Sequence, residues 1–283
     1  MRSERDKLKN LFLAVVCAAC VLGYASGQES SALTRPLKFT SEEVKLPFTF
    51  QRSTRDDAYM TRLRQLYALD GVVAGKKSDY EKVRALSMWV RKRWEHNGSN
   101  EPQKPDPISI LQEAAAGKSF RCVEYSVVLS AALNAVGIPA RVLGLKTEDV
   151  ETRESGAGHV VTEAYLADKK KWIMVDGQWD VIPTLKGRPL HAVELQEALA
   201  TRASGLGVES LSGAKADKYF QWVAPYLFYF DTRFDSRIEG AAHTRSLMLV
   251  PVGAKEPSVF QKKHSLKSMV YTNSTRVFYA PPA

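Results

Sequence analysis

Cys122 begins an apolar, alanine-rich run, and the helical spacing of the residues after it predicts a buried helix from 122 to about 136. Ser119 is expected to cap the start of this helix, and Gly137 is expected to end it. A thiol in the first turn of a helix lies at the positive end of the helix dipole, and Arg121 adds a neighbouring cation. Both charges favour the thiolate, which is the nucleophilic form of cysteine.

Two residues that would complete a nucleophilic site follow in order. His159 precedes a segment of alternating hydrophobicity, and Asp176 follows the apolar segment 172–175. If these segments are adjacent antiparallel strands, the imidazole and the carboxylate lie side by side. The residue types therefore predict a triad in which His159 is general base and acid to Cys122, and Asp176 orients the ring. Asp180 is the rival candidate for the orienting role.

The supporting residues of such a site are less well defined by the sequence. An oxyanion hole would use the backbone N–H of Cys122 and one side-chain donor, for which Trp94 and Gln178 are both candidates. Glu163 lies four residues after His159, so the two share one face of a strand. Glu163 would either modulate the site electrostatically or form a structural hydrogen bond, and we favour the hydrogen bond.

Four segments in this order resemble the core of the transglutaminase-like superfamily. They are the Cys-headed helix, Gly-Ile-Pro-Ala-Arg at 137–141, the Gly-His strand with Glu163 and Tyr165, and the Trp…Val-Asp strand. The resemblance covers about Asp79 to Pro183. It implies a papain-like core that performs acyl transfer at amides, by cross-linking, deamidation or peptide hydrolysis.

The resemblance also carries over to single residues. Cys122, His159 and Asp176 match the family's catalytic triad, with separations of 37 and 17 positions. Arg141 matches the arginine that follows Pro-Ala in the family and is expected to be a buried ion-pair partner. The family's commoner His-Ala-Trp is His-Val-Val at 159–161 here, so an aromatic residue beside the histidine is missing.

The predicted fold class is α+β, with the nucleophile helix packed on an antiparallel sheet. Residues 219–230 form the most aromatic segment, which we interpret as a helix and strand packed on the core, with a substrate-binding wall as the alternative. The other expected elements are helices at 56–69, 79–94, 106–116 and 192–200, strands at 44–50, 141–145, 160–167, 172–175, 247–252 and 269–279, and loops at 147–158 and 204–213.

The first residues have the pattern of an export signal. A basic start is followed by the apolar run 11–22, which is short for a membrane span. We predict a signal peptide at 1–27, a flexible tether at 28–40 and a single domain at 41–283, in a periplasmic or extracellular protein. A retained signal anchor and a lipoprotein modified at Cys20 are the alternatives.

Signal cleavage would leave Cys122 as the sole cysteine, without a disulfide partner in the chain. The alternatives are a reactive thiol and a small buried hydrophobe, and the position of Cys122 favours the thiol. The cysteines are too few for a Cys-rich zinc site, and the predicted chemistry needs no cofactor.

The formal net charge is +9, of which residues 1–27 carry +2. Such a balance favours acidic partners or a membrane surface, although a basic solvated surface is the simpler interpretation. No dense Lys/Arg block is interleaved with aromatic residues, so nucleic acid is not an expected partner. A protein or peptide substrate is the expected partner, and the sequence leaves the oligomeric state open.

The same residues are compatible with other functions. Hydrolysis is favoured over transfer to an amine because water is the default acceptor. A non-catalytic domain that binds ligands in the same groove is one alternative. An amine acyltransferase that takes its acyl group from a thioester is the other.

Overall fold

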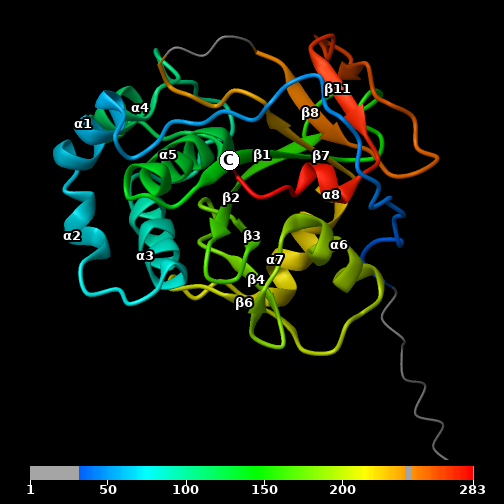
Figure 1. The fold of residues 1–283 in the computed structure, drawn as a ribbon, viewed down its shortest axis with the longest axis horizontal. Helices are drawn as coiled ribbons and strands as arrows, with labels where there is room; N and C mark the ends of the chain where they lie inside the picture. The colour runs from blue at the N-terminus through cyan, green and yellow to red at the C-terminus, as the bar shows by residue number, and fades with distance from the viewer. Residues whose placement is uncertain (1–31, 240–243, 283) are drawn as a thin grey trace, which may run out of the picture. The chain divides into compact units, whose positions relative to one another are not determined.

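A six-stranded sheet forms the centre of the structure and is covered by helices on both faces (Figure 1). The computed structural model describes residues 32–239 and 244–282, so the predicted signal peptide lies outside the described residues. The apolar residues of α1–α5 pack on one face of the sheet, and those of α6 and α7 pack on the other. This arrangement confirms the predicted α+β class.

The first half of the described chain is helical. Local caps account for several helix starts: Ser78 and Asp106 each accept a hydrogen bond from the backbone three residues later. The helices are α1 Ala58–Leu66, α2 Leu69–Val73, α3 Asp79–Arg91, α4 Pro107–Ala115, α5 Cys122–Ala135, α6 Ala192–Ala200, α7 Ala216–Val223 and α8 Thr275–Phe278, with a 3-10 turn η1 at Ala224–Tyr226.

The central sheet has the strand order β11-β8-β7-β1-β2-β3 and is antiparallel except where β11 meets β8. Its strands are β1 Ala140–Lys146, β2 Gly158–Leu166, β3 Lys171–Val175, β7 Tyr229–Arg233, β8 Ser246–Leu249 and β11 Met269–Thr272. A smaller sheet joins β4 Ile182–Leu185, β5 Arg188–Pro189 and β6 Leu206–Glu209, and β9 Val259–Phe260 pairs with β10 His264–Ser265. Because β2 and β3 form a hairpin, the residues that follow β3 return toward the start of β2.

The nucleophile helix α5 begins at Cys122 with Arg121 as its N-cap, so the expected Ser119 cap is wrong. The backbone N–H of Arg121 donates to Glu124 Oε2 at 3.1 Å, while Phe120 forms a β-bridge with His96. This bridge keeps the chain extended as far as Phe120. The helix ends as expected, with Gly137 in the left-handed region at φ +89°.

Several other expectations are corrected by long-range contacts. Residues 44–50, all described, are irregular, because Phe48 and Phe50 anchor this segment on the ring of Phe234 without a strand partner. The predicted 204–213 loop contains β6, which pairs with β4. The predicted strand at 269–279 divides into β11 and α8.

The helix boundaries also differ in places. The first helix was expected to end at Asp70-Gly71, but both residues lie within α2, which follows a left-handed turn at Ala68. The second helix ends at Arg91 and does not reach Trp94.

The described part of the predicted tether contacts the rest of the domain. Phe39 packs edge-on against Phe230, with ring centroids 6.2 Å apart. The carbonyl of Lys38 accepts a hydrogen bond from the backbone of Val252 at 2.8 Å. Lys38 and Phe39, within the segment predicted as a flexible tether, are therefore attached to the domain in the structure. No helix within 32–239 or 244–282 has the length and apolar character needed to span a membrane.

Candidate active site

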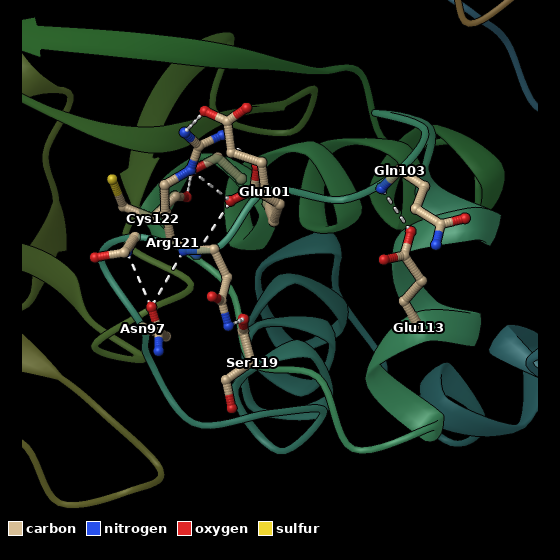
Figure 2. Close-up of polar contacts among 11 residues, drawn as sticks. Asn97, Glu101, Gln103, Glu113, Ser119, Arg121 and Cys122 are labelled. Atoms are coloured by element: carbon tan, nitrogen blue, oxygen red, sulfur yellow. Dashed lines mark hydrogen bonds and ion pairs between the residues drawn. The ribbon is translucent and has the colours of Figure 1, made fainter.

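Cys122 is the first residue of α5 and carries a free, half-buried thiol. Figure 2 shows it beside Arg121 and the loop that runs from Asn97. The guanidinium of Arg121 is bound by Glu101 and by Glu124, whose Oε1 lies 2.8 Å from Nη2. Two carboxylates therefore offset the cation, and the N-terminus of α5 remains as the nearby positive potential.

His159 and Asp176 are hydrogen-bonded to one another and almost fully buried. His159 Nε2 lies 2.7 Å from Asp176 Oδ2, and the two residues are 2% and 0% exposed. His159 lies within β2, where the sequence placed it in the preceding loop. With Nε2 bonded to Asp176, the other ring nitrogen, Nδ1, is the one left to interact with Cys122, which also acts on the pKa of His159. The structure thus brings all three predicted triad residues together.

The environment of His159 favours its protonated form. Burial alone would lower the pKa of His159, but the charge and hydrogen bond of Asp176 and the contact with Cys122 outweigh it and raise the pKa to about 9. The ring therefore carries both protons at neutral pH. A cationic imidazole beside a thiol favours the thiolate, which is the state required for nucleophilic attack.

Two local features hold the three elements in register. Ser126, one turn into α5, donates from Oγ to the carbonyl of Val160 at 2.8 Å and so fastens the helix to β2. After Asp176 the chain turns through Gly177, where an added Cβ would lie 3.3 Å from Leu129 of α5. A glycine there allows the turn that carries Asp176 to approach the nucleophile helix closely.

Asp180, the rival orienting residue, has a structural role. Its Oδ1 accepts from Ser87 Oγ at 2.8 Å, and its Oδ2 accepts from the backbone amides of Leu211 and Ser212. Asp180 therefore joins α3 to the segment after β6 and does not contact His159 through either oxygen.

The two oxyanion candidates differ in their surroundings. Trp94 is 6% exposed, its ring packs at 4.5 Å on Tyr125 of α5, and its Nε1 has no hydrogen-bond partner among the described residues. Gln178 donates its backbone N–H to Asp176 Oδ1 at 3.0 Å, and its Oε1 is buried without a partner in the described part of the chain. Both side chains retain unused hydrogen-bonding capacity near the triad.

The carboxylate of Glu163 is occupied by a buried ion pair, as the structural interpretation predicted. It accepts from Arg141 at 2.6 and 3.0 Å, and Arg141 also donates to the carbonyl of Phe278 at 2.9 Å. The guanidinium lies 4.5 Å from the ring of Trp172. Glu163 therefore binds the C-terminal helix to the sheet and does not reach the thiol.

Replacing Glu163 with glutamine should destabilise the fold by about 3–5 kcal/mol, because the buried Arg141 would lose its counter-charge. Urea unfolding measures this loss. Glu148→Gln, which breaks an exposed pair with Arg35, is the matched control and should cost less than about 1 kcal/mol. Alkylation of Cys122 in the folded Glu163→Gln protein should match the wild type, and a large drop would assign Glu163 to the site instead.

Aromatic residues that the sequence did not assign to the site surround His159. Tyr219 donates from its hydroxyl to Asp176 Oδ2 at 3.1 Å, and Trp222 meets the imidazole edge-to-face at 4.6 Å. The ring of Tyr226 lies 6.0 Å from that of His159. All three belong to the aromatic segment 219–230, whose composition was the only signal in the sequence.

Two further groups approach the site from loops. Burial and the charge of His159 both lower the pKa of His96. Burial raises the pKa of Tyr226, with Cys122 acting in the same direction and Arg153 in the opposite one. Arg153 lies in the 147–157 loop, so this loop reaches the neighbourhood of the thiol.

The 147–157 loop is bound to the C-terminal part of the chain. Glu151 pairs with Lys255 and accepts from the backbone of Ser258 at 2.8 Å, and Glu154 pairs with Lys262 at 2.9 Å. Phe260 packs on Gly158, where an added Cβ would lie 3.1 Å from its ring. The loop before His159 is thereby fixed at both ends. Across residues 32–239 and 244–282, no three His, Cys, Asp or Glu side chains gather as a metal-binding group.

The comparison with protein families agrees with this geometry. Residues 67–177 match the sequence model of the core of the transglutaminase-like superfamily. This part of the chain is a transglutaminase-like domain, which confirms the resemblance seen in the four sequence segments. The comparison with curated proteins found no match.

The comparison with solved structures also returned matches. A proposed cysteine protease of Cytophaga hutchinsonii is 16% identical over 53% of this chain and 47% of its own, with a TM-score of 0.35. A structure described as a TGase is 20% identical over 43% and 32%, with a TM-score of 0.32. LapG of Legionella pneumophila is 14% identical over 62% and 97%, with a TM-score of 0.33. The chain spans less than half of the first two proteins.

Proposed function

We propose that this protein is a thiol-dependent enzyme that transfers acyl groups from amide or peptide bonds. The observation that carries the proposal is the position of His159, which is bonded at 2.7 Å to the buried Asp176 and lies close enough to Cys122 for the thiol to act on its pKa. Nucleophile, base and orienting carboxylate in this arrangement are the parts that covalent acyl transfer requires. The transglutaminase-like core supports the same class of chemistry.

In the first half of the reaction, the Cys122 thiolate attacks the amide carbonyl and forms a carbon–sulfur bond. The carbonyl oxygen gains the negative charge, which the backbone N–H of Cys122 can stabilise because it has no partner within the helix. Trp94 Nε1 or the side-chain amide of Gln178 would supply the second donor. His159 then gives its Nδ1 proton to the leaving nitrogen, and the carbon–nitrogen bond breaks.

In the second half, an acceptor attacks the resulting thioester. His159 removes the proton of the acceptor, and the thiolate leaves as the new acyl bond forms. Asp176 keeps Nε2 protonated throughout and stabilises the imidazolium. We propose water as the acceptor, because the half-buried thiol is open to solvent.

The location and partners of the protein follow from its sequence. We propose that residues 1–27 direct export and that the substrate is a protein or peptide outside the cytoplasm. The positive net charge would favour acidic substrates or attachment to an anionic membrane surface.

A panel of glutamine-containing peptides tests the proposal by release of ammonia or amine, with and without an added primary amine. We expect release that depends on Cys122, an acyl-enzyme detected by intact mass, and no activity in Cys122→Ala. If the product contains the added amine, the acceptor is an amine and the proposed hydrolysis is replaced by acyl transfer. If coenzyme A thioesters acylate Cys122 and amides do not, the amide-cleaving function is wrong. If neither acylates it and alkylation is slow, the groove only binds.

A further inference from the structure

Helix α7 lies outside the residues that match the family core, yet it places two side chains on the triad. Tyr219 and Trp222 are three positions apart on this helix, so they share one face. Tyr219 reaches Asp176, and Trp222 reaches His159. The charged pair at the centre of the site is therefore completed by the C-terminal third of the chain.

The two oxygens of Asp176 are saturated in different ways. Oδ1 accepts from the backbone amides of Gln178 and Trp179, at 3.0 and 3.2 Å. Oδ2 accepts from both His159 Nε2 and the Tyr219 hydroxyl. Tyr219 is fully buried. Because its hydroxyl donates to the same oxygen of Asp176 as His159 does, it reduces the share of the carboxylate's negative charge that acts on the imidazole.

Trp222 covers the imidazole from the side. The two rings meet at 77°, and Trp222 is itself held by Trp179 at 5.1 Å and Tyr226 at 5.5 Å. The hydrogen bond from His159 Nε2 to Asp176 is kept beside this ring contact. An apolar ring at this distance keeps water away from the ion pair, where the lower local dielectric strengthens the attraction.

We infer that Tyr219 and Trp222 are positioning residues of the triad: Tyr219 limits how much of the Asp176 charge acts on His159, and Trp222 shields the His159–Asp176 bond from water. The inference rests on the proposed function, since positioning matters for the reaction only if the triad is catalytic. It assigns a role in the reaction to a segment that lies beyond residues 67–177, which match the family.

The titration of His159 separates the two roles, because removing each side chain should shift it in opposite directions. In Tyr219→Phe, Asp176 loses one donor and acts more strongly on the imidazole, so the titration midpoint should rise. In Trp222→Ala, water relieves the burial that lowers the pKa of His159 and also screens the attraction of Asp176 that outweighs it. The midpoint should therefore fall from about 9 toward the free value of about 6.5. Shifts of about half a pH unit or more are expected. Besides Asp176, the titratable groups near the ring are Cys122, Tyr226 and His96.

NMR of protein labelled with ¹⁵N-histidine measures these midpoints without a substrate. Tyr59→Phe is the matched control for Tyr219, because it removes a Tyr–Asp hydrogen bond far along the chain, to Asp106. Trp89→Ala is the control for Trp222, because Trp89 is also half-buried and packs on Tyr67. Neither control should move the His159 midpoint. Trp222→Phe should restore it to near the wild-type value.

A structural role alone would lower stability in both variants without opposite shifts. Unmoved midpoints, or midpoints that move in the same direction, would overturn the inference. If Trp222→Ala does not fold, Trp222→Thr retains more volume and still leaves the imidazole open to water, and Tyr219→Phe tests the other arm separately. Opposite shifts in a protein that cleaves no amide would refute the proposed function and leave the positioning intact.

Discussion

His159→Ala is expected to reduce turnover on any amide substrate by about 10⁴-fold or more, because both proton transfers pass through this ring. The same change should slow alkylation of Cys122 at pH 7 by about tenfold, since the thiolate loses its neighbouring cation. Iodoacetamide labelling followed by intact mass measures the second effect without knowledge of the substrate. His159 shares its buried hydrogen bond with Asp176, so alkylation is best compared in protein shown to be folded.

His159→Gln provides a second variant that can still donate to Asp176. His264→Ala is the control, because it removes an exposed histidine from β10. Alkylation in this control should match the wild type. If the rate at Cys122 is the same in wild type and both His159 variants, the two residues do not act as a pair.

Asp176→Asn should reduce turnover by about 10³–10⁴-fold while leaving the shape of the site intact. The neutral side-chain amide of the asparagine no longer stabilises the imidazolium of His159. It can also turn its NH₂ group, instead of its oxygen, toward His159 Nε2. The charge of Asp176 raises the pKa of His159 to about 9, so the wild-type activity should decline only as the pH rises through that value. In Asp176→Asn this decline should move to lower pH, toward about 6.5.

Asp180→Asn is the matched control for this experiment. Asp180 is also buried and accepts three hydrogen bonds, from Ser87 and two backbone amides, but none from His159. It should lower stability and leave the alkaline limit of activity unchanged. If the alkaline limit of activity moves in Asp180→Asn and stays in Asp176→Asn, the orienting residue is Asp180 and not Asp176.

The same pair should make stability depend on pH. His159 binds its proton more tightly in the folded state, so the stabilisation is complete below the unfolded pKa of about 6.5 and is lost as the pH rises through about 9. The difference between these two pKa values corresponds to roughly 3 kcal/mol of folding stability, at 1.36 kcal/mol per pH unit. Urea unfolding should therefore show the advantage of wild type over Asp176→Asn shrinking between pH 6 and pH 9.5.

The sequence predicted those parts of the fold that depend on local signals. Helix α6 matches its predicted bounds, and α4 starts at the Asp106 cap followed by a proline. The β2–β3 hairpin follows from alternating hydrophobicity and the polar turn between the strands. Cys122 lies at the start of α5, His159 near the start of β2, and Asp176 just after β3. The meeting of the three residues therefore also follows from local patterns and chain order.

The remaining features depend on contacts between distant segments. Ser119 has the right chemistry for a helix cap, but the bridge from Phe120 to His96 moves the N-cap to Arg121. The 204–213 segment is rich in glycine and serine and becomes a strand only because β4 lies beside it. Tyr219 and Trp222 were visible only as aromatic residues, since nothing near them in the chain indicates a bond to Asp176 or a contact with His159.

The place of β7 in the central sheet has a consequence for the newly made polypeptide. Strand β1 lies between β2 and β7, with Gly144 opposite Asp231 and Leu145 opposite Phe230. A ribosome completes the triad residues well before it reaches β7, so the partly made chain exposes one unpaired edge of β1. Such an edge is a template for aggregation. The edge of β1 is therefore covered by β7 at the same stage of synthesis at which α7 completes the site.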